Sequence, residues 1–302
     1  MAPITDLALS SLALADRWIL NRAYKTIVAA KEHLESFRLD DAAKACFEFA
    51  WNDLADWYVE AVKPRLAATA PPSTAAQRAP AAPGDAAAAQ AVLAFCFDTV
   101  LRLLHPIVPF ITEELWQKLP GRQPDDLLAI AAWPTVPPGL LKLQADFEFA
   151  GVQEAISKIR TIRAEYRVAP KTRLAAAIKA RTELMRTAFD GERDTILRLA
   201  QLSELELDGK LQGAGAHAVL ADGSEVFVVL SDAIDVQQEC RRLSGELTRL
   251  EQQLTGLTAK LANQQFVARA PAEVVAKERE KERAWRDQRQ VLADKLKSLG
   301  CS

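Results

Sequence analysis

A regular apolar repeat near the carboxy end constrains the fold more than any other feature of this sequence. From residue 236 to residue 261, apolar residues recur at alternating intervals of four and three, which is the pattern of a left-handed coiled coil. The members of this repeat are Val236, Cys240, Leu243, Leu247, Leu250, Leu254, Leu257 and Leu261. A seam of this length needs a partner, and the break at 263–270 is too short for anything but a reversal. Residues 232–302 are therefore predicted to form an antiparallel coiled-coil hairpin.

The second helix of this hairpin is expected to begin at Pro271, a residue that suits the first turn of a helix. Its predicted seam is Val274, Trp285, Leu292, Leu296 and Leu299, with a more polar middle. Arg279, Arg283 and Arg286 point about 100–160° away from Trp285, at 100° per residue. Glutamates interleave with these arginines, so intrahelical ion pairs are the alternative to a contact with RNA.

The amino-terminal part, residues 1–140, predicts an antiparallel helical bundle. Apolar residues recur at helical spacing from Asp16 to Leu34, and the other face of this helix has three cations. These cations are Arg17, Arg22 and Lys25. A second helix is expected from the capping residues Asp40 and Asp41 towards Pro64, where helix continuation is unfavourable. Four aromatic residues of the bundle could stack on bases, although aromatics at helical spacing are more often core residues. They are Trp51, Trp57 and Tyr58 of this helix and Trp116 of a later one.

Two further helices complete the predicted bundle. Residues 67–90 consist almost wholly of Ala, Pro, Ser, Thr, Gln and Gly, a composition that indicates a surface loop. A third helix is expected to follow, from about residue 92 to residue 103. The fourth is expected after Pro109, with Thr112 as its N-cap.

The pattern changes at residues 141–231, which predict a small α+β module. A helix from about 146 to 166 precedes strands near 174–179, 204–207 and 218–230, the last folded about Asp222-Gly223 as a hairpin. Basic residues repeat every three or four positions along this helix and its exit, where they could contact phosphates or form a solvated basic face. They are Arg160, Arg163, Arg167 and Lys171. The predicted fold class is thus mainly α, with a bundle, an α+β module and a carboxy-terminal hairpin.

Composition limits the possible functions. The formal net charge of −2 and the pI near 6.0 mean that any nucleic-acid contact must come from local basic patches. The four cysteines lack CxxC spacing and the three histidines fall in different segments, which argues against a metal site and against a disulfide framework. No apolar stretch is expected to reach the roughly 20 residues that span a bilayer, and the amino terminus has no signal peptide pattern. No membrane partner and a cytoplasmic location are expected.

Several segments resemble the carboxy-terminal region of valyl-tRNA synthetase, and together they cover nearly the whole chain. LADRWIL at 14–20 and FEFAWNDLADWYVEAVKPRL at 47–66 resemble the anticodon-binding domain of the class I synthetases for valine, isoleucine and leucine. LRLLHPIVPFITEELWQKLPG at 101–121 is similar to a signature of that whole subgroup. NQQFVARAPAEVVAKEREK at 263–281 resembles the hairpin of the valine enzymes and discriminates them from their relatives.

The resemblance implies that the partner is tRNA(Val), held at the anticodon stem and at the elbow. It also implies that the arginines of the second hairpin helix contact the tRNA elbow, with Arg269 as a further candidate at the tip. Phe266 and Val267 could cap the last layer of the seam, or Phe266 could stack on an exposed tertiary base pair of the tRNA. HIGH-like and KMSKS-like motifs and an editing domain are absent from this sequence, so it is not expected to attach valine to tRNA alone. ATP and Mg²⁺ would belong to a separate or missing catalytic half, and no cofactor is expected here. The first helix of the family's anticodon domain is also expected to be missing, with only residues 1–13 in its place.

Two other functions remain open at this stage. One is a stand-alone RNA-binding module without ligase activity. The other is a coiled-coil interaction protein whose hairpin binds other helices rather than RNA. A measurement of tRNA binding separates the last of these from the rest.

Overall fold

A computed structural model describes residues 12–67, 85–123, 125–209, 211–231 and 233–301. The chain is mainly α-helical with one small mixed sheet, which confirms the predicted fold class. By contacts it divides into two compact units, residues 1–154 with 183–199, and residues 155–182 with 200–302. The three-part division at 140 and 231 stays a prediction.

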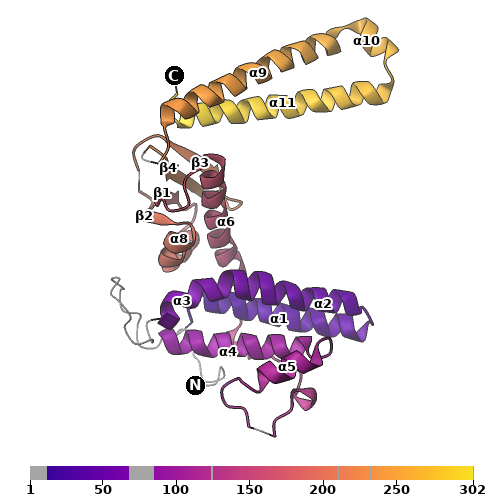
Figure 1. Cartoon of the computed structure of the whole chain (residues 1–302), viewed down its shortest axis with the longest axis vertical. Helices are drawn as coiled ribbons and strands as arrows, with labels where there is room; N and C mark the ends of the chain where they lie inside the picture. The colour runs from indigo at the N-terminus through magenta and orange to yellow at the C-terminus, as the bar shows by residue number, and fades with distance from the viewer. Residues whose placement is uncertain (1–11, 68–84, 124, 210, 232, 302) are drawn as a thin grey trace. The chain divides into compact units, whose positions relative to one another are not determined.

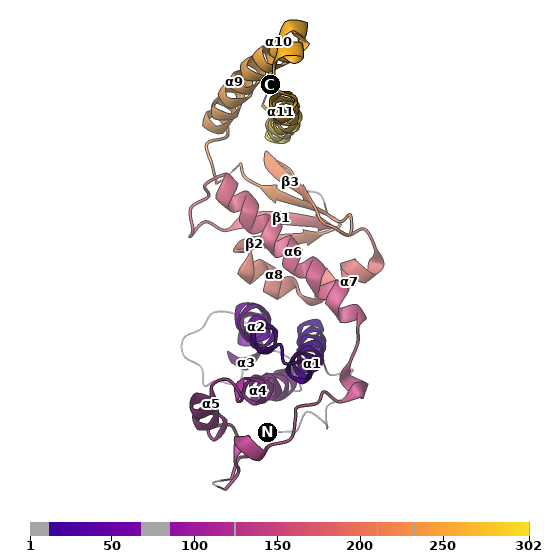
Figure 2. The same ribbon diagram turned by 90° about the vertical axis from the view of Figure 1, so that its right-hand side faces the viewer.

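The first unit is built on antiparallel helices, which Figure 1 shows side by side. They are α1 (Leu14–Glu35), α2 (Leu39–Glu48), η3 (Phe49–Val59, wound as a π-helix), α3 (Glu60–Ala67), α4 (Asp85–Leu104) and α5 (Pro109–Trp116). Two short 3₁₀ turns follow, η4 (Leu128–Ile130) and η5 (Pro138–Leu140). Figure 2 shows α1, α2 and α4 nearly end on, around a core that contains Ile19, Tyr58 and Val92.

A buried ionic cluster joins three segments of this bundle. Asp16 of α1 is fully buried, and both of its carboxylate oxygens accept hydrogen bonds from the Arg65 guanidinium, at 2.8 and 2.7 Å. The hydroxyl of Tyr58 in η3 donates to the same carboxylate at 2.7 Å. Burial and the adjacent carboxylate raise the pKa of Tyr58 well above its usual value, so this hydroxyl stays protonated and remains a donor. We call Asp16, Tyr58 and Arg65 the bundle triad.

Several details of the bundle differ from the sequence predictions. Asp40 and Asp41 lie inside the first turn of α2, whose N-cap is Arg38, where carboxylates favour the positive end of the helix dipole. Thr112 is also inside its helix, and its hydroxyl donates back to the Val108 carbonyl at 2.9 Å. The prediction of Asp40, Asp41 and Thr112 as caps was wrong.

The structure places the two ends of the predicted loop, residues 67 and 85–90, in helices instead. Ala67 ends α3 and Asp85 begins α4, because the alanines after Asp85 favour helix. Residues 68–84 lie outside the described part. At the amino end, Leu12 and Leu14 are buried in the bundle, whereas residues 1–11 lie outside the described part.

Within the described residues, one helix segment, Ala86–Leu104 of α4, is long and apolar enough by composition to cross a membrane. This segment differs from the expectation that no apolar stretch is long enough, because the polar residues Gln90, Asp98 and Arg102 interrupt it in the sequence. Half of the segment is buried, and α4 packs against α1, α2, α3 and α5. Its burial and its packing are those of a core helix of the bundle.

The second unit contains a four-stranded sheet in the order β2-β1-β4-β3. The strands are β1 (Leu174–Lys179), β2 (Leu202–Leu207), β3 (Gly215–Val219) and β4 (Glu225–Val229). The predicted hairpin at Asp222-Gly223 joins β3 to β4, with Gly223 at φ 86°. The connection from β1 to β2 contains α7 (Glu183–Gly191) and α8 (Arg193–Leu199), two helices that the sequence did not predict. Figure 2 shows α6 (Gln144–Glu165) along one face of the sheet, and Ile159 of this helix is fully buried.

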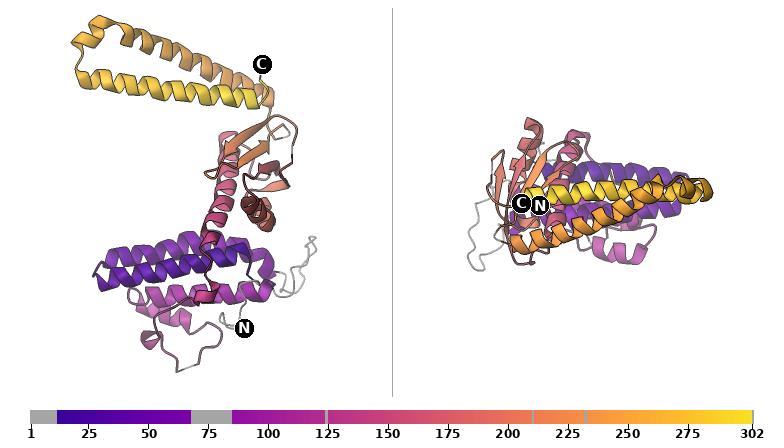
Figure 3. Two further views of the ribbon diagram at one scale, coloured as in Figure 1. Left: turned by 180° about the vertical axis from the view of Figure 1, so that it is seen from behind. Right: turned by 90° about the horizontal axis from the view of Figure 1, so that it is seen from above.

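The carboxy-terminal helices form the predicted antiparallel hairpin. Its elements are α9 (Val236–Ala262), α10 (Gln264–Arg269) and α11 (Ala272–Ser298), and Figure 3 shows α10 at the end opposite to the chain terminus. Leu243, Leu250, Leu257 and Leu292 are buried between the long helices. Pro271 is the N-cap of α11 rather than part of its first turn, and Val275 is buried in place of Val274, which is 41% exposed. We refer to α9, α10 and α11 together as the hairpin.

Candidate nucleic-acid interface

The cations of α1 are largely engaged within the first unit. Arg22 donates to Asp53 at 2.7 Å, and Lys25 forms an ion pair with Asp146. Arg17 is half-buried. A phosphate would have to compete with these carboxylates for Arg22 and Lys25, so this group is a weaker candidate than its sequence pattern suggested.

The basic residues near the end of α6 divide into two kinds. Arg163 is only 8% exposed, and its guanidinium donates to the side chain of Gln201 at 2.9 Å and to the Ala169 carbonyl at 3.3 Å. Burial lowers the pKa of Arg163, and its partners make it a structural residue that positions the turn before β1. Arg160, Arg167 and Lys171 are exposed, and their contact with phosphates stays a prediction.

The exposed arginines of α11 form the most open basic group. Arg279, Arg283 and Arg286 lie on one side of the helix and are all exposed. Among the residues that the structure describes, Arg279 and Arg283 have no carboxylate within ion-pair distance, whereas Arg286 donates to Glu282 at 2.7 Å. We call these three residues the arm stripe.

The glutamates that interleave with the arm stripe are directed largely to other partners. Glu278 is half-buried and accepts from Lys260 of α9 at 2.8 Å, and this hydrogen bond lowers its pKa. Glu282 accepts from Thr258 of α9 at 2.9 Å as well as from Arg286. Lys260 thus pairs with Glu278 and Arg286 with Glu282, whereas Arg279 and Arg283 have no such partner among the described residues. The alternative of purely intrahelical pairing therefore holds for Arg286 alone.

A residue that the sequence analysis missed extends this face. Lys297 is exposed and lies 18 positions after Arg279, which is five turns at 3.6 residues per turn. It therefore points in the same direction as Arg279, roughly 27 Å along the helix at 1.5 Å per residue. Helical phase could have identified Lys297 from the sequence.

At the hairpin tip, Phe266 is half-buried and the Lys260 ammonium lies 4.8 Å from its ring centroid. Asn263 caps α10, because its side-chain oxygen accepts from the backbone N–H of Gln265 at 2.9 Å. This cap fixes the position of the segment that contains Phe266. The side chains of Val267 and Arg269 lie outside the described part, so the predicted contact of Arg269 stays a prediction.

The aromatic residues of the bundle separate clearly by exposure. Tyr58 and Trp116 are core residues, and the Trp116 indole donates to Asp98 at 2.6 Å. Trp57 is half-buried. Trp51 is 59% exposed and lies parallel to Phe47, with ring centroids 6.1 Å apart. Of the four aromatics considered for base stacking, Trp51 is the most exposed.

A groove of about 660 Å³ in the first unit was also missed. Tyr24, Val28 and Lys31 of α1 form one wall, and the segment from Trp133 to Pro138 forms the other. The sequence contains a sign of this groove, because Tyr24 and Val28 are apolar residues four positions apart on the polar side of α1. In the structure these two residues are 41% and 37% exposed. A groove with aromatic walls and a lysine has the chemistry to accept an unpaired base beside its phosphate.

No group of three or more His, Cys, Asp or Glu that could hold a metal ion occurs among the described residues. Cys46 and Cys96 are buried free thiols, and burial raises the pKa of Cys46 to about 11. Cys240 and Cys301 form a disulfide, which corrects the sequence-based expectation against disulfide bonding.

The described residues thus form a helical bundle, a small mixed sheet and a helical hairpin with exposed arginines on one side. Residues 16–178 match the family of anticodon-binding domains of tRNA ligases, and residues 235–300 match the valyl tRNA synthetase tRNA binding arm. Since the first match covers more than half of the chain, the chain belongs to the family of tRNA ligase anticodon-binding domains.

Curated relatives point to one member of that class. The chain is 33% identical to the valine–tRNA ligase of Symbiobacterium thermophilum, over 98% of this chain and 33% of that protein. It is 35% identical to the valine–tRNA ligase of Geobacter sulfurreducens, over 97% and 32%, and 36% identical to that of Carboxydothermus hydrogenoformans, over 95% and 31%. The chain thus spans about a third of the length of the curated relatives it matches.

Proposed function

We propose that this chain binds tRNA(Val) as the carboxy-terminal part of a valine–tRNA ligase, with its bundle on the anticodon side and its hairpin against the elbow. Valine would be joined to the tRNA by a catalytic portion that is not within this sequence. ATP and Mg²⁺ would bind that portion, and the reaction would take place in the cytoplasm.

The arm stripe is the observation that supports this proposal best. Arg279 and Arg283 are exposed without carboxylate partners in the described part of the chain, in a protein whose formal net charge is −2. Exposed arginines on one side of a long helix, two of them without an ion pair among the described residues, are suited to contact phosphates, because each guanidinium can donate two parallel hydrogen bonds. The position of this row within the segment that matches the tRNA binding arm supports RNA as the partner.

The bundle offers two features for the anticodon side. The exposed Phe47 and Trp51 pair can stack on unpaired bases, at roughly 1–3 kcal/mol per base. The groove beside Tyr24 and Lys31 can enclose another. Both lie within the segment that matches the anticodon-binding domain family.

Charge reversal of the arm stripe tests the proposal. The variant with Arg279, Arg283 and Arg286 each changed to Glu should bind tRNA(Val) more than tenfold more weakly than the wild type, a difference of about 1.4 kcal/mol or more. The matched control changes Arg241, Arg249 and Lys277 to Glu, which alters the net charge equally at exposed positions away from the stripe. Equal loss in both variants would show that only overall charge matters, and no loss in either would remove RNA as the partner of the hairpin.

A second experiment concerns the absent chemistry. The isolated chain should show no valine-dependent exchange of ATP with pyrophosphate, whereas addition of a matching catalytic portion should restore charging of tRNA(Val). Exchange by the chain alone would contradict the assignment of catalysis to another portion. Retained tRNA binding without any restorable charging would instead favour a stand-alone RNA-binding module.

A further inference from the structure

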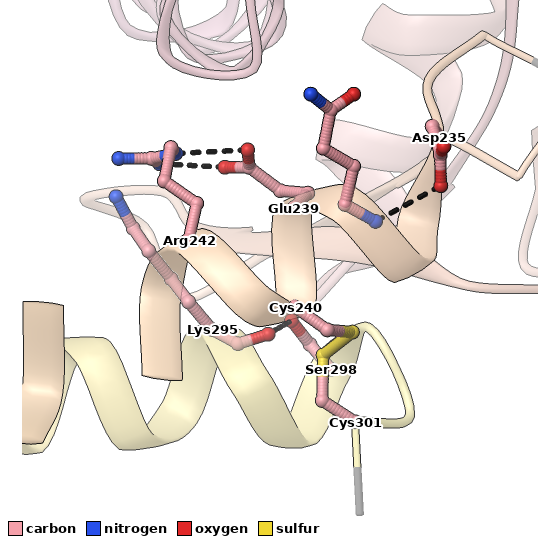
Figure 4. The surroundings of a disulfide bond; sticks show 8 residues. Asp235, Glu239, Cys240, Arg242, Lys295, Ser298 and Cys301 are labelled. Atoms are coloured by element: carbon pink, nitrogen blue, oxygen red, sulfur yellow. Dashed lines mark hydrogen bonds and ion pairs between the residues drawn. A yellow bond between two sulfur atoms is a disulfide. The ribbon is translucent and has the colours of Figure 1, made fainter. Parts of the chain in front are cut away.

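The open end of the hairpin has a pair of cysteines whose position the tRNA-binding proposal does not explain. Figure 4 shows the bond between Cys240, near the start of α9, and Cys301, just beyond the end of α11. Their Cα atoms are 5.7 Å apart, within the usual range for a disulfide, although 61 positions separate them in the sequence. The pair connects the two helices at the end opposite to the tip.

Local structure places each cysteine independently of the bond. Asp235 caps α9, since its carboxylate accepts from the backbone N–H of Gln238 at 2.9 Å, and Cys240 belongs to the apolar repeat that faces α11. At the other end, the N–H of Gly300 donates to the Lys297 carbonyl at 3.1 Å. The N–H of Cys301 donates to the Leu296 carbonyl at 2.9 Å, which completes a Schellman motif.

Gly300 is necessary for this geometry. Its φ of 72° lies in the left-handed region, which glycine adopts without the steric cost that a Cβ imposes. The turn directs Cys301 back towards the first turns of α9 instead of away from the hairpin. The two caps and the leucine seam thus supply contacts, other than the disulfide itself, that bring Cys240 and Cys301 to the same end of the hairpin.

Exposure separates this pair from the other two cysteines. Cys240 and Cys301 are half-buried, so a small reagent can approach them. Cys46 and Cys96 are buried, and burial raises their pKa values, which suppresses the thiolate needed for exchange. In the presence of reduced glutathione, the fraction of protein with a disulfide depends on the reduction potential of the pair and on that of its surroundings. An accessible pair of cysteines therefore responds to the redox state of its surroundings.

We propose that Cys240 and Cys301 are a reversible thiol–disulfide modification site that links the two ends of the hairpin, with small disulfides of the glutathione class as the oxidant. One thiolate attacks the small disulfide, forms a mixed disulfide and releases one small thiol. The second thiolate then attacks the protein-bound sulfur, forms the Cys240–Cys301 bond and releases the second small thiol. The protein loses two electrons and two protons, and the small disulfide becomes two thiols. This proposal does not depend on RNA binding.

The test uses the full chain, reduced and then equilibrated with glutathione buffers of different ratio. Peptide mapping should find a single intramolecular link between Cys240 and Cys301, reversed by excess reduced glutathione, while Cys46 and Cys96 remain thiols. Amide hydrogen exchange at 236–243 and 292–300 should be slower in the oxidised form. Cys240→Ser should show no such slowing and should instead carry glutathione on Cys301.

Gly300→Ala probes the preorganisation without removing either thiol. No atom lies within 4 Å of the added Cβ, so the effect is confined to the backbone. The equilibrium constant for closing the disulfide should fall by up to about 30-fold, the factor that corresponds to a left-handed alanine. Mixed disulfides alone in the wild type, equal reaction of Cys46, or hydrogen exchange independent of oxidation would each overturn the proposal.

Discussion

Replacement of Arg65 by Met in the bundle triad leaves the fully buried Asp16 carboxylate without its two guanidinium hydrogen bonds. Met preserves much of the apolar stem of the arginine, so the change removes charge more than volume. Removal of one partner from a buried ion pair costs about 3–5 kcal/mol, because the remaining charge stays desolvated. Against a total stability of about 5–15 kcal/mol, this is a large fraction for the first unit.

Two further variants serve as comparisons for the stability cost of Arg65→Met. Tyr58→Phe removes a single hydrogen bond to the same carboxylate and should cost about 1.5–3 kcal/mol. Arg22→Met breaks an ion pair with Asp53 in which the arginine is 38% exposed, so solvent screening limits its cost to about 0–1 kcal/mol. The expected order of destabilisation is Arg65→Met, then Tyr58→Phe, then Arg22→Met.

Hydrogen exchange during urea titration, followed in peptides from α1 and α3, measures the opening free energy of this unit separately from the other. The same variants should leave peptides from the sheet unchanged. A cost for Arg65→Met no larger than that for Arg22→Met would refute the claim that the bundle triad stabilises the first unit.

Three further outcomes follow from the structure. Gly215→Ala should destabilise the sheet by about 1–3 kcal/mol, since its Cβ would lie close to the Val228 carbonyl oxygen. Gly245→Ala in α9 should stabilise the hairpin by about 0.5–1 kcal/mol, because no atom lies within 4 Å of the added Cβ. Unfolding midpoints equal to that of the wild type would contradict both. Burial raises the pKa of Glu192 in the folded state, so its contribution to the unfolding free energy is greatest at low pH and falls as the pH rises. Glu192→Gln should therefore be more stable than the wild type at pH 7, with a difference that closes below about pH 4, and a gap independent of pH would count against it. Reduction of the disulfide should lower the unfolding free energy of the hairpin by up to about 4 kcal/mol in the chain-entropy description, and identical denaturation curves with and without reductant would argue otherwise.

Periodicity predicted the regular elements well. The repeat from Asp16 to Leu34 corresponds to α1, and the predicted strand at 174–179 coincides with β1. The short helices α7 and α8 were missed because seven to nine residues give too few turns for a clear apolar period. The π-helical winding of η3 was also not predicted, since π-helices are rare.

The sequence predicted which side of a helix the candidate residues occupy, but it did not predict their hydrogen-bond and ion-pair partners. Helical phase placed Arg279 and Arg283 away from the seam, and both are exposed. The buried role of Arg163 depends on Gln201, which lies 38 positions later in the chain. The engagement of Lys25 depends on Asp146, which is 121 positions away. Partners so distant leave no local pattern, and the same holds for the pairing of Cys240 with Cys301.

The salt dependence of tRNA(Val) binding tests the central claim most directly. The logarithm of the wild-type association constant should fall linearly with the logarithm of salt concentration, because bound phosphates release their counterions. Charge reversal of Arg279, Arg283 and Arg286 should reduce that slope by about 2–3, at roughly 0.7–0.9 for each lost phosphate contact. The control variant of Arg241, Arg249 and Lys277 should keep the wild-type slope. An arm-stripe variant with the wild-type affinity and the wild-type slope would contradict the assignment of the hairpin as a tRNA-binding surface.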